Sequence, residues 1–287
     1  MKPQTENRYL ERVDRAARLL AERLADPPGA DELARAVGVS RFHFQRIYRA
    51  ATGETLLETL SRLRALRALE RLSAGASVTE VAGAVGYDTP QAFARAFRQW
   101  TGVTPSEARD RARALSARFQ QSAVPQATPL DIEIASMNPL RLTVVRTRRP
   151  FGPLNDVYES LFEAAARQGK LDAVQGIFGL PENDPISDPA GLERHIAGIS
   201  LDDAVLDGFE TIDIAEASAL RLRHTGPFEE IDTTSLAMYR HVVDRDLALV
   251  DSPQLQHHLD DPEQVPVQRL RTDLYLALVE SDKGLSR

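Results

Sequence analysis

The 287-residue sequence contains no cysteine, which excludes disulfide bonds and thiolate chemistry. It also has no apolar run of about eighteen residues, the length that a membrane-spanning helix requires. The first residues, MKPQTENRYLER, lack the apolar core of a secretory signal peptide. These absences lead us to expect a soluble, cytoplasmic protein that makes no contact with a membrane.

Motifs of common enzyme and metal sites are also missing. The sequence has no G-x-S-x-G nucleophile elbow, no phosphate-binding loop and no H-E-x-x-H zinc motif. His257 and His258 lie close to Asp260 and Asp261, but adjacent residues on a strand point to opposite faces and cannot easily chelate one ion. We predict no metal site, no cofactor and no catalytic residue.

Charge is divided unevenly along the chain. Residues 1–118 hold 20 Arg and Lys against 14 Asp and Glu, a net charge of +6. Residues 119–287 hold 15 against 28, a net charge of −13, and the two halves sum to −7. A basic half joined to an acidic half indicates a nucleic-acid-binding module fused to a module of another kind.

Residues 31–53 have the pattern of two short helices joined by a tight turn. Gly38 is suited to end the first helix and Ser40 to cap the second. The outward side of the second helix carries Arg41, Gln45, Arg46 and Arg49. Such side chains read base edges and hold phosphates, which favours a helix-turn-helix motif, although an ordinary helical hairpin with a solvated basic face fits this segment equally well.

A second copy of the pattern covers residues 79–102. It repeats the apolar and glycine positions of the first copy 48 to 49 residues later. Thr89 is placed to cap its second helix, and Pro90 occupies the first helical position, where a missing N–H costs nothing. The outward side carries Gln91, Arg95 and Arg98. Two such units in one chain favour the helix-turn-helix interpretation.

The first third of the chain resembles the DNA-binding domain of AraC/XylS-type transcription regulators. The resemblance rests on A-R-A-V-G-V-S-R-F-H-F-Q-R-I-Y (34–48), R-L-R-A-L-R-A (62–68), V-G-Y-D-T-P-Q-A-F-A-R-A-F (85–97) and T-G-V-T-P (101–105). It implies base reading by Phe42, Gln45, Arg46, Gln91 and Arg95. Pro90 departs from the polar residue that family members place there, so the resemblance carries no base reading to it.

A long helix is predicted over residues 54–72, between the two motifs. It would hold them at a fixed separation, so that both enter the major groove on one face of the duplex, roughly 10 bp apart. One flank of this helix carries Arg62, Arg64, Arg67 and Arg71. We expect some of these arginines to contact phosphate and none to read bases, the alternative being a solvated helix face.

After a polar, proline-containing linker, the chain repeats itself with a period of 77 residues. Arg146-x-x-x-Pro150-Phe151 recurs as Arg223-x-x-x-Pro227-Phe228. Each repeat is predicted to run strand, helix, strand, strand, and together they form an antiparallel sheet with both helices on one face and a concave cleft on the other. The predicted boundaries are 1–115 for an all-α domain, 116–129 for the linker and 130–287 for an α+β domain with repeats at about 130–206 and 207–280.

The second half resembles the GyrI-like (gyrase-inhibitor-like) effector-binding domain. The resemblance rests on R-H-T-G-P-F-E-E-I (223–231), D-D-P-E-Q-V-P (260–266) and R-T-D-L-Y-L-A-L (271–278). It implies a cleft for bulky, flat and often cationic compounds, but the family's acidic position falls here on Gln256 and its usual tyrosine on His258. Because an amide cannot stabilise a buried cation as a carboxylate does, we expect cationic ligands less than in the family at large.

Phe178 and Tyr275 complete the predicted effector site as stacking aromatics, with core packing as the alternative for each. Arg146 and Arg223 are candidates for binding an anionic ligand or for pairing with nearby acidic residues such as Glu229. Some proteins that resemble this half are hydrolases with a glutamate in the cleft. Gln256 removes that general base.

The predicted fold is therefore multidomain, with two helix-turn-helix motifs joined by a long helix, followed by the α+β domain. The predicted function is that of a one-component transcription regulator, which senses a small, bulky or aromatic effector. Its implied partners are double-stranded promoter DNA, the effector and RNA polymerase. One alternative is a DNA-binding protein whose second half docks a partner or binds no ligand. A tethered enzyme is the weakest hypothesis.

Overall fold

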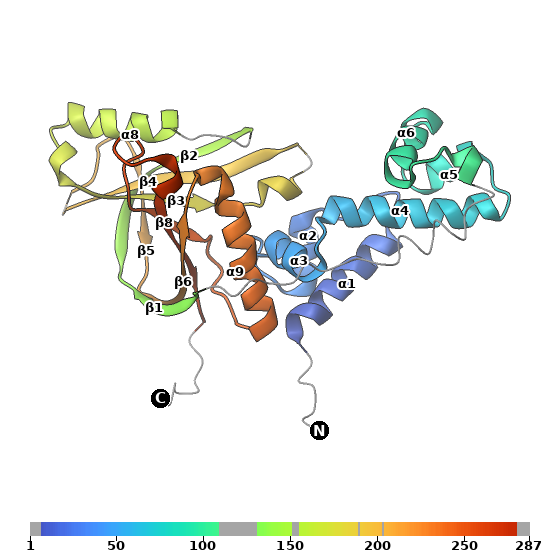
Figure 1. The fold of residues 1–287 in the computed structure, drawn as a ribbon, viewed down its shortest axis with the longest axis horizontal. Coiled ribbons are helices and arrows are strands. Elements are labelled where there is room, and N and C mark those ends of the chain that lie inside the picture. Colours follow the sequence, from blue (N-terminus) through green and yellow to red (C-terminus); the bar gives the residue numbers. More distant parts are fainter. Residues whose placement is uncertain (1–6, 109–130, 151–154, 189, 203, 280–287) are drawn as a thin grey trace, which may run out of the picture. The chain divides into compact units, whose positions relative to one another are not determined.

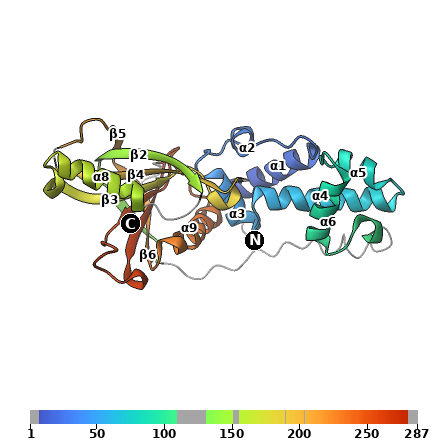
Figure 2. The same cartoon turned by 90° about the horizontal axis from the view of Figure 1, so that it is seen from above.

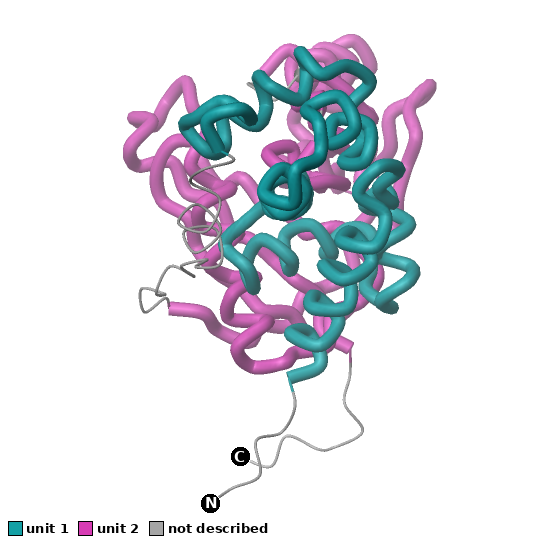
Figure 3. Tube along the Cα trace, turned by 90° about the vertical axis from the view of Figure 1, so that its right-hand side faces the viewer, with its two compact units in different colours: residues 1–126 teal, residues 127–287 magenta. Residues whose placement is uncertain are grey.

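The computed structural model describes residues 7–108, 131–150, 155–188, 190–202 and 204–279. The chain divides into two compact units, residues 1–126 and 127–287 (Figure 3). The predicted linker 116–129 lies outside the described residues. No helix in the described ranges is both long enough and apolar enough to cross a membrane.

Unit 1 is helical. Within residues 7–108 its helices are α1 (Arg8–Glu22), α2 (Ala30–Val37), α3 (Phe44–Thr52), α4 (Leu56–Ser73), α5 (Val78–Ala84) and α6 (Pro90–Thr101) (Figure 1). The long helix predicted over 54–72 is confirmed by α4, which runs without interruption between the α2–α3 pair and the α5–α6 pair. Thr89 caps α6 by accepting a hydrogen bond from the Ala92 amide, and Pro90 is its first residue, as predicted.

The start of α3 differs from the prediction. Gly38 does end α2 in the left-handed conformation, with φ 68°. Residues 41–43 form a turn rather than the first turn of a helix, and α3 begins only at Phe44, with His43 at the N-cap position. The Ser40 hydroxyl accepts from the Phe42 amide within that turn. Arg41 and Phe42 therefore precede α3 and are not part of it.

Buried apolar side chains form a core at each end of α4. In the first half of unit 1 they come from α1, α2 and α3, and include Leu20, Leu33, Phe44 and Ile47. In the second half a single cluster joins α4 to α5 and α6 and includes Leu69, Leu72, Val81, Phe93 and Phe97. Burial of these faces, more than intrinsic helix propensity, stabilises such short helices.

In its described residues, unit 2 is built on one eight-stranded antiparallel sheet (Figure 1 and Figure 2). Its strands are β1 (Glu133–Met137), β2 (Leu140–Pro150), β3 (Val174–Pro181), β4 (Leu192–Leu201), β5 (Glu210–Ile214), β6 (Ala217–Thr225), β7 (Leu255–His258) and β8 (Arg271–Ala277). Their order is β1-β6-β8-β7-β3-β4-β2-β5. Two helices, α8 (Asn155–Arg167) and α9 (Ile231–Arg245), connect β2 to β3 and β6 to β7.

Each half of unit 2 runs strand, strand, helix, strand, strand, so the predicted pattern missed the first strand of each repeat. The missed strands, β1 and β5, begin at residues 133 and 210, which are 77 positions apart. They form the two edges of the sheet, and each pairs with the second strand of the other half, β1 with β6 and β5 with β2. Exchanging the halves leaves the strand order unchanged when it is read backwards.

Both helices lie on the same face of the sheet, as predicted. The His258 ring on β7 contacts Tyr158 of α8, with ring centroids 6.0 Å apart. The same histidine bonds Thr272 on β8, whose register partner His224 is bonded to Thr234 of α9. We call this side of the sheet the helix face. The opposite face carries its own apolar cluster, which includes Leu142, Val144, Leu180, Ile196 and Leu255.

Candidate functional sites

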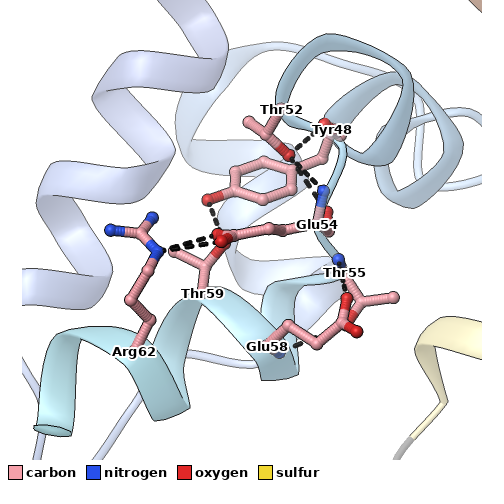
Figure 4. Close-up of polar contacts among 7 residues, drawn as sticks. All are labelled: Tyr48, Thr52, Glu54, Thr55, Glu58, Thr59 and Arg62. Carbon is pink, nitrogen blue, oxygen red and sulfur yellow. Dashed lines mark hydrogen bonds and ion pairs between the residues drawn. The ribbon is translucent and has the colours of Figure 1, made fainter. Parts of the chain in front are cut away.

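A network of polar side chains fixes α3 against the start of α4 (Figure 4). The Tyr48 hydroxyl donates to Thr59 Oγ1 at 3.1 Å, and the Thr59 hydroxyl donates to Glu54 at 3.0 Å. Arg62 closes the chain by donating its Nε–H to both Glu54 carboxylate oxygens, at 2.9 and 3.0 Å. Burial raises the pKa of Tyr48, so the phenol stays a donor. The network therefore fixes the orientation of α3 relative to the N-terminal end of α4.

The junction of the two helices is also capped. Thr55 accepts from the Glu58 amide, while the Glu58 carboxylate accepts from the Thr55 amide, a complete capping box. The Thr52 hydroxyl bonds the carbonyls of Tyr48 and Glu54 across the turn. Backbone groups at both helix ends are thus satisfied locally, which makes the corner rigid.

The α6 helix displays the side chains that the sequence assigns to DNA contacts. Thr89, Gln91, Arg95 and Arg98 are all exposed. The opposite side of α6 is anchored by Phe93 and Phe97, whose ring centroids lie 5.4 Å apart in the core. A helix held by one face and carrying amide and guanidinium groups on the other has the chemistry to read a major groove.

The α3 helix is different. Arg41 is exposed, with its guanidinium 4.6 Å from the centroid of the Phe42 ring, and Phe42 and Gln45 are half-buried. Arg46 and Arg49 are only 3% and 7% exposed, whereas their counterparts 49 positions later, Arg95 and Arg98, are exposed. A buried guanidinium cannot contact a base or a phosphate. In this conformation α6 presents its basic side chains, whereas α3 presents part of Gln45 and the turn before it presents Arg41.

The arginines along α4 have separate contacts. Arg62 is bound to Glu54, and Arg67 pairs with Glu70 on the surface. Arg64 donates from Nε and Nη2 to the carbonyl of Leu24, at 3.0 and 2.8 Å. Two of the four guanidinium groups are therefore engaged by other segments of unit 1, and the exposed Arg67 and Arg71 are better placed for phosphate.

The four predicted effector residues lie on two faces of the sheet. Phe178 stacks on His257 with ring centroids 4.4 Å apart, and both belong to the face opposite the helices, where Tyr275 packs against the same cluster. Gln256 and His258, which alternate with His257 along β7, lie on the helix face. The structure brings these residues together in pairs and does not bring all four into one site.

The helix face holds a buried polar cluster that the sequence did not single out. Glu193 and His195 on β4 are 6% and 3% exposed, and Glu193 Oε1 lies 3.1 Å from His195 Nδ1. The other ring nitrogen, Nε2, is buried without a hydrogen-bond partner among the described residues. A β-carbon at Gly179 would lie 2.8 Å from this Nε2 and 3.1 Å from Gln256 Oε1, so the two polar atoms converge on a glycine.

The same face of the sheet carries aromatic rings around His258. Tyr158 and Phe228 contact the His258 ring edge-on, with centroids 6.0 and 5.0 Å away. Burial, together with the neighbouring His195 and His257, lowers the pKa of His258 to about 3, so its imidazole is neutral. Burial and the charge of Glu193 raise the pKa of Tyr158. The helix face therefore combines neutral aromatic walls with one carboxylate.

Arg146 and Arg223 are paired with acidic side chains of the same sheet. Arg223 donates to both oxygens of Asp273 at 2.7 and 2.8 Å, and Arg146 pairs with Glu210 and Glu182. Burial by itself raises the pKa of Asp273, but the Arg223 hydrogen bonds and charge hold that pKa below its ordinary value. These contacts are the structural pairing that the sequence left open, made with other carboxylates than Glu229. His257 and His258 occupy opposite faces, and no metal-binding group of three ligands occurs among the described residues.

Comparison with known proteins identifies both halves. A family model for a helix-turn-helix domain matches residues 33–111, and one for a GyrI-like small molecule binding domain matches residues 130–279, more than half of the chain. The regulatory protein SoxS of Salmonella typhimurium is 33% identical over 91 residues, which cover 31% of this chain and 85% of SoxS. The chain belongs to the AraC-type family and carries a GyrI-like domain. Both resemblances drawn from the sequence are confirmed.

Other relatives share the AraC-type part. The MmsAB operon regulatory protein of Pseudomonas aeruginosa is 38% identical over 84 residues, which span 29% of this chain and 27% of that protein. The solved structure of a transcriptional regulator from Chromobacterium violaceum, titled as AraC-type, is 25% identical, with a TM-score of 0.34, over 36% of this chain and 92% of that one. The chain thus spans about a quarter of the length of the MmsAB regulator.

The GyrI-like domain contains the functional candidates that sequence reasoning missed, Glu193, His195 and Tyr158. A signal for two of them was present. In L-E-R-H-I-A-G-I-S, residues 192–200, Glu and His stand two positions apart at the start of a strand, which places both on one face. Tyr158 belongs to a helix whose orientation only the packing shows.

Proposed function

We propose that this protein is a one-component transcription regulator, whose AraC-type unit binds a DNA site and whose GyrI-like domain binds a small-molecule effector. The observation that carries the proposal is the exposed Gln91, Arg95 and Arg98 side of α6 in a chain that also contains a small-molecule binding domain. Binding of the effector regulates DNA binding only if its affinity differs between DNA-bound and DNA-free forms.

The DNA-binding part is tested with duplexes selected by the full chain from a randomised library. Replacing Arg95 with Ala is expected to weaken the best duplex by about 1–3 kcal/mol and to relax the preference at one base pair. Arg167→Ala removes the same charge from an exposed position on α8 and serves as the matched control. Unchanged affinity of Arg95→Ala would remove this residue from base reading, and retention of no duplex at low salt would refute the proposal.

For α3 the proposal has a further requirement. Arg46 must become exposed before it can contact a base, because its guanidinium is buried in this structure. In the free protein, Arg46 is expected to be protected from arginine-specific chemical modification. In the complex, the operator positions that Arg46 contacts are expected to be protected by the bound protein. RNA polymerase as a partner stays a prediction.

We place the effector site on the helix face, around Glu193, His195 and Gln256. When His195 donates its Nδ1 proton to Glu193, Nε2 becomes an acceptor, and Gln256 Oε1 converges on the same point. Two acceptors on a face that also carries the rings of Tyr158, Phe228 and His258 suit a bulky aromatic compound that carries N–H or O–H donors. Phe178 and Tyr275, on the opposite face, are assigned to packing.

This site is tested by thermal unfolding of the full chain with a panel of aromatic amines and alcohols. A ligand present at 100 times its Kd is expected to stabilise the protein by about 2.7 kcal/mol. His195→Phe should weaken binding at least tenfold, while His241→Gln on α9 should leave it unchanged. Equal affinity for His195→Phe would move the site elsewhere, and a panel without any stabilising compound would favour the partner-docking alternative.

A further inference from the structure

Three segments of unit 1 that are distant in sequence meet at the Arg64 side chain. Arg64 lies near the middle of α4 and binds the Leu24 carbonyl, just beyond α1, with two N–H donors. Its guanidinium carbon also lies 5.1 Å from the centroid of the Tyr87 ring, in the turn between α5 and α6. One side chain thus touches the end of α1, α4 itself and the turn of the second helix pair.

The backbone is tightly packed at the same place. Gly86, with φ 81°, has the left-handed conformation, and a β-carbon there would lie 2.7 Å from both Ala25 Cα and Arg64 Nη2. The second turn therefore approaches the main chain after α1 as closely as a glycine permits. This contact and the Arg64 hydrogen bonds form one joint, which we call the α1–α5 joint (Arg64, Leu24, Ala25, Gly86 and Tyr87).

The joint connects two groups of helices that otherwise share α4. On one side α1 packs with α2 and α3, and on the other α5 and α6 pack on the C-terminal part of α4. The 18-residue α4 is about 27 Å long. Two groups of helices that are joined by one helix alone can bend and twist relative to each other about its axis. The α1–α5 joint attaches the two groups a second time, beside that axis, and so blocks this rotation.

This rotation matters for DNA. B-form duplex turns once in about 10 bp, so one base pair corresponds to roughly 35° of rotation. A twist of that size between the helix pairs would put α6 one base pair out of register with α3.

We propose that Arg64 is a positioning residue that sets the spacing between the two half-sites of the operator. The inference rests on the proposed function, because it requires that both helix pairs contact DNA. We assign Arg64 no contact with DNA, because its Nε and Nη2 donate to the Leu24 carbonyl and its guanidinium lies over the Tyr87 ring. The exposed Arg67, one turn further along α4, serves for comparison, because loss of a phosphate contact should weaken binding equally at every spacing and leave the insertion penalty unchanged.

The experiment measures how strongly the full chain prefers one spacing. A duplex is selected from a randomised library, and its two half-sites are separated by inserting one or two base pairs. For the natural chain each insertion is expected to weaken binding at least tenfold. For Arg64→Ala the selected duplex should bind at least threefold more weakly, and the insertion penalty should shrink to within about twofold. Arg67→Ala should keep the full penalty.

Two further readouts separate positioning from other roles. A duplex carrying only the half-site read by α6 should bind the natural chain and Arg64→Ala equally. The slope of log Kd against log salt should not change, whereas loss of a phosphate contact would reduce it by about 1. If Arg64→Ala does not fold, Arg64→Lys, which keeps the charge but not the fork, and Tyr87→Leu are tested in the same way.

The outcomes are distinct. If the natural chain retains no duplex, the proposed function fails. If it binds DNA but tolerates insertions, or if the folded Arg64 and Tyr87 variants keep the full insertion penalty, the positioning role of Arg64 is overturned while the proposed function stands. A reduced salt slope for Arg64→Ala would assign the residue to phosphate binding instead.

Discussion

Neutral His258 in the interior of the GyrI-like domain makes the stability of unit 2 depend on pH. The ring is enclosed by Tyr158 and Phe228 and bonded to Thr272. Burial and the neighbouring His195 and His257 lower the pKa of His258 to about 3, against 6.5 for an ordinary histidine. In the unfolded chain His258 is therefore protonated as the pH falls below about 6.5, whereas in the folded chain it stays neutral down to about pH 3.

The sign and size of the effect follow from this difference. The contribution of His258 to stability is complete above pH 6.5 and is lost progressively as the pH falls towards 3, because the unfolded state binds more protons in that window. Within the window the slope is about 1.4 kcal/mol per pH unit. Between pH 7 and pH 4.5 the free energy of unfolding should fall by about 2.5 kcal/mol from this residue alone.

The assay compares urea unfolding of the full chain at pH 7 and pH 4.5 for the natural protein and for His258→Gln. Glutamine keeps a donor and acceptor near Thr272 but does not titrate. Circular dichroism follows both units, and the single tryptophan, Trp100, reports unit 1 alone, so the two transitions can be separated. The natural unit 2 should lose about 2.5 kcal/mol more than the variant over this range.

Comparison with the variant also removes the contributions of the other titratable groups. Titratable groups away from His258 are present unchanged in both proteins, so their contributions cancel in the difference. Equal losses of stability in the natural protein and in His258→Gln would show that His258 titrates alike in the folded and unfolded states. That result would refute the reasoning from its burial.

Three further predictions concern stability at pH 7. Phe93→Ala, in the core of the second helix pair, should cost unit 1 about 3–5 kcal/mol in urea unfolding, while Gln99→Ala on the exposed side of α6 should change it by less than about 0.5. Leu161→Ala on α8 should cost unit 2 about 2–5 kcal/mol, and Leu171→Ala at an exposed position much less. Thr55→Ala, which breaks the capping box of α4, should cost about 1 kcal/mol, and a cost near zero would show that Glu58 alone satisfies that helix end.

Much of unit 1 could be predicted because its signals are local. Gly38 ends α2 in the left-handed conformation, and Thr89 with Pro90 starts α6. Apolar residues at intervals of three and four give each helix one face to bury. The predicted start of α3 was wrong, because the Ser40 hydroxyl bonds within a turn instead of capping the helix. The sequence does not distinguish these two uses of a serine hydroxyl.

The sheet was harder to predict at its edges. β1 and β5 are short and carry mostly polar or charged residues at their exposed positions, as in E-I-A-S-M and E-T-I-D-I, although Ile134 of β1 is also exposed. An edge strand is bonded on one side only and half-exposed, so it lacks the continuous apolar pattern that marked the central strands. The period of 77 residues contained both strands, but their pairing with the opposite half is a long-range property.

What the sequence determined by itself was the periodicity, the capping and the family, because these depend on neighbours a few residues away. The tertiary structure alone decided which side chains are accessible. Arg46 and Arg95 occupy equivalent places in their repeats, yet one is buried and the other exposed. Gln256 joins His195 on the helix face while Phe178 stacks on His257 beyond it. The burial of a residue depends on segments that are distant in the sequence and pack against it in the fold. A local sequence pattern therefore does not predict it.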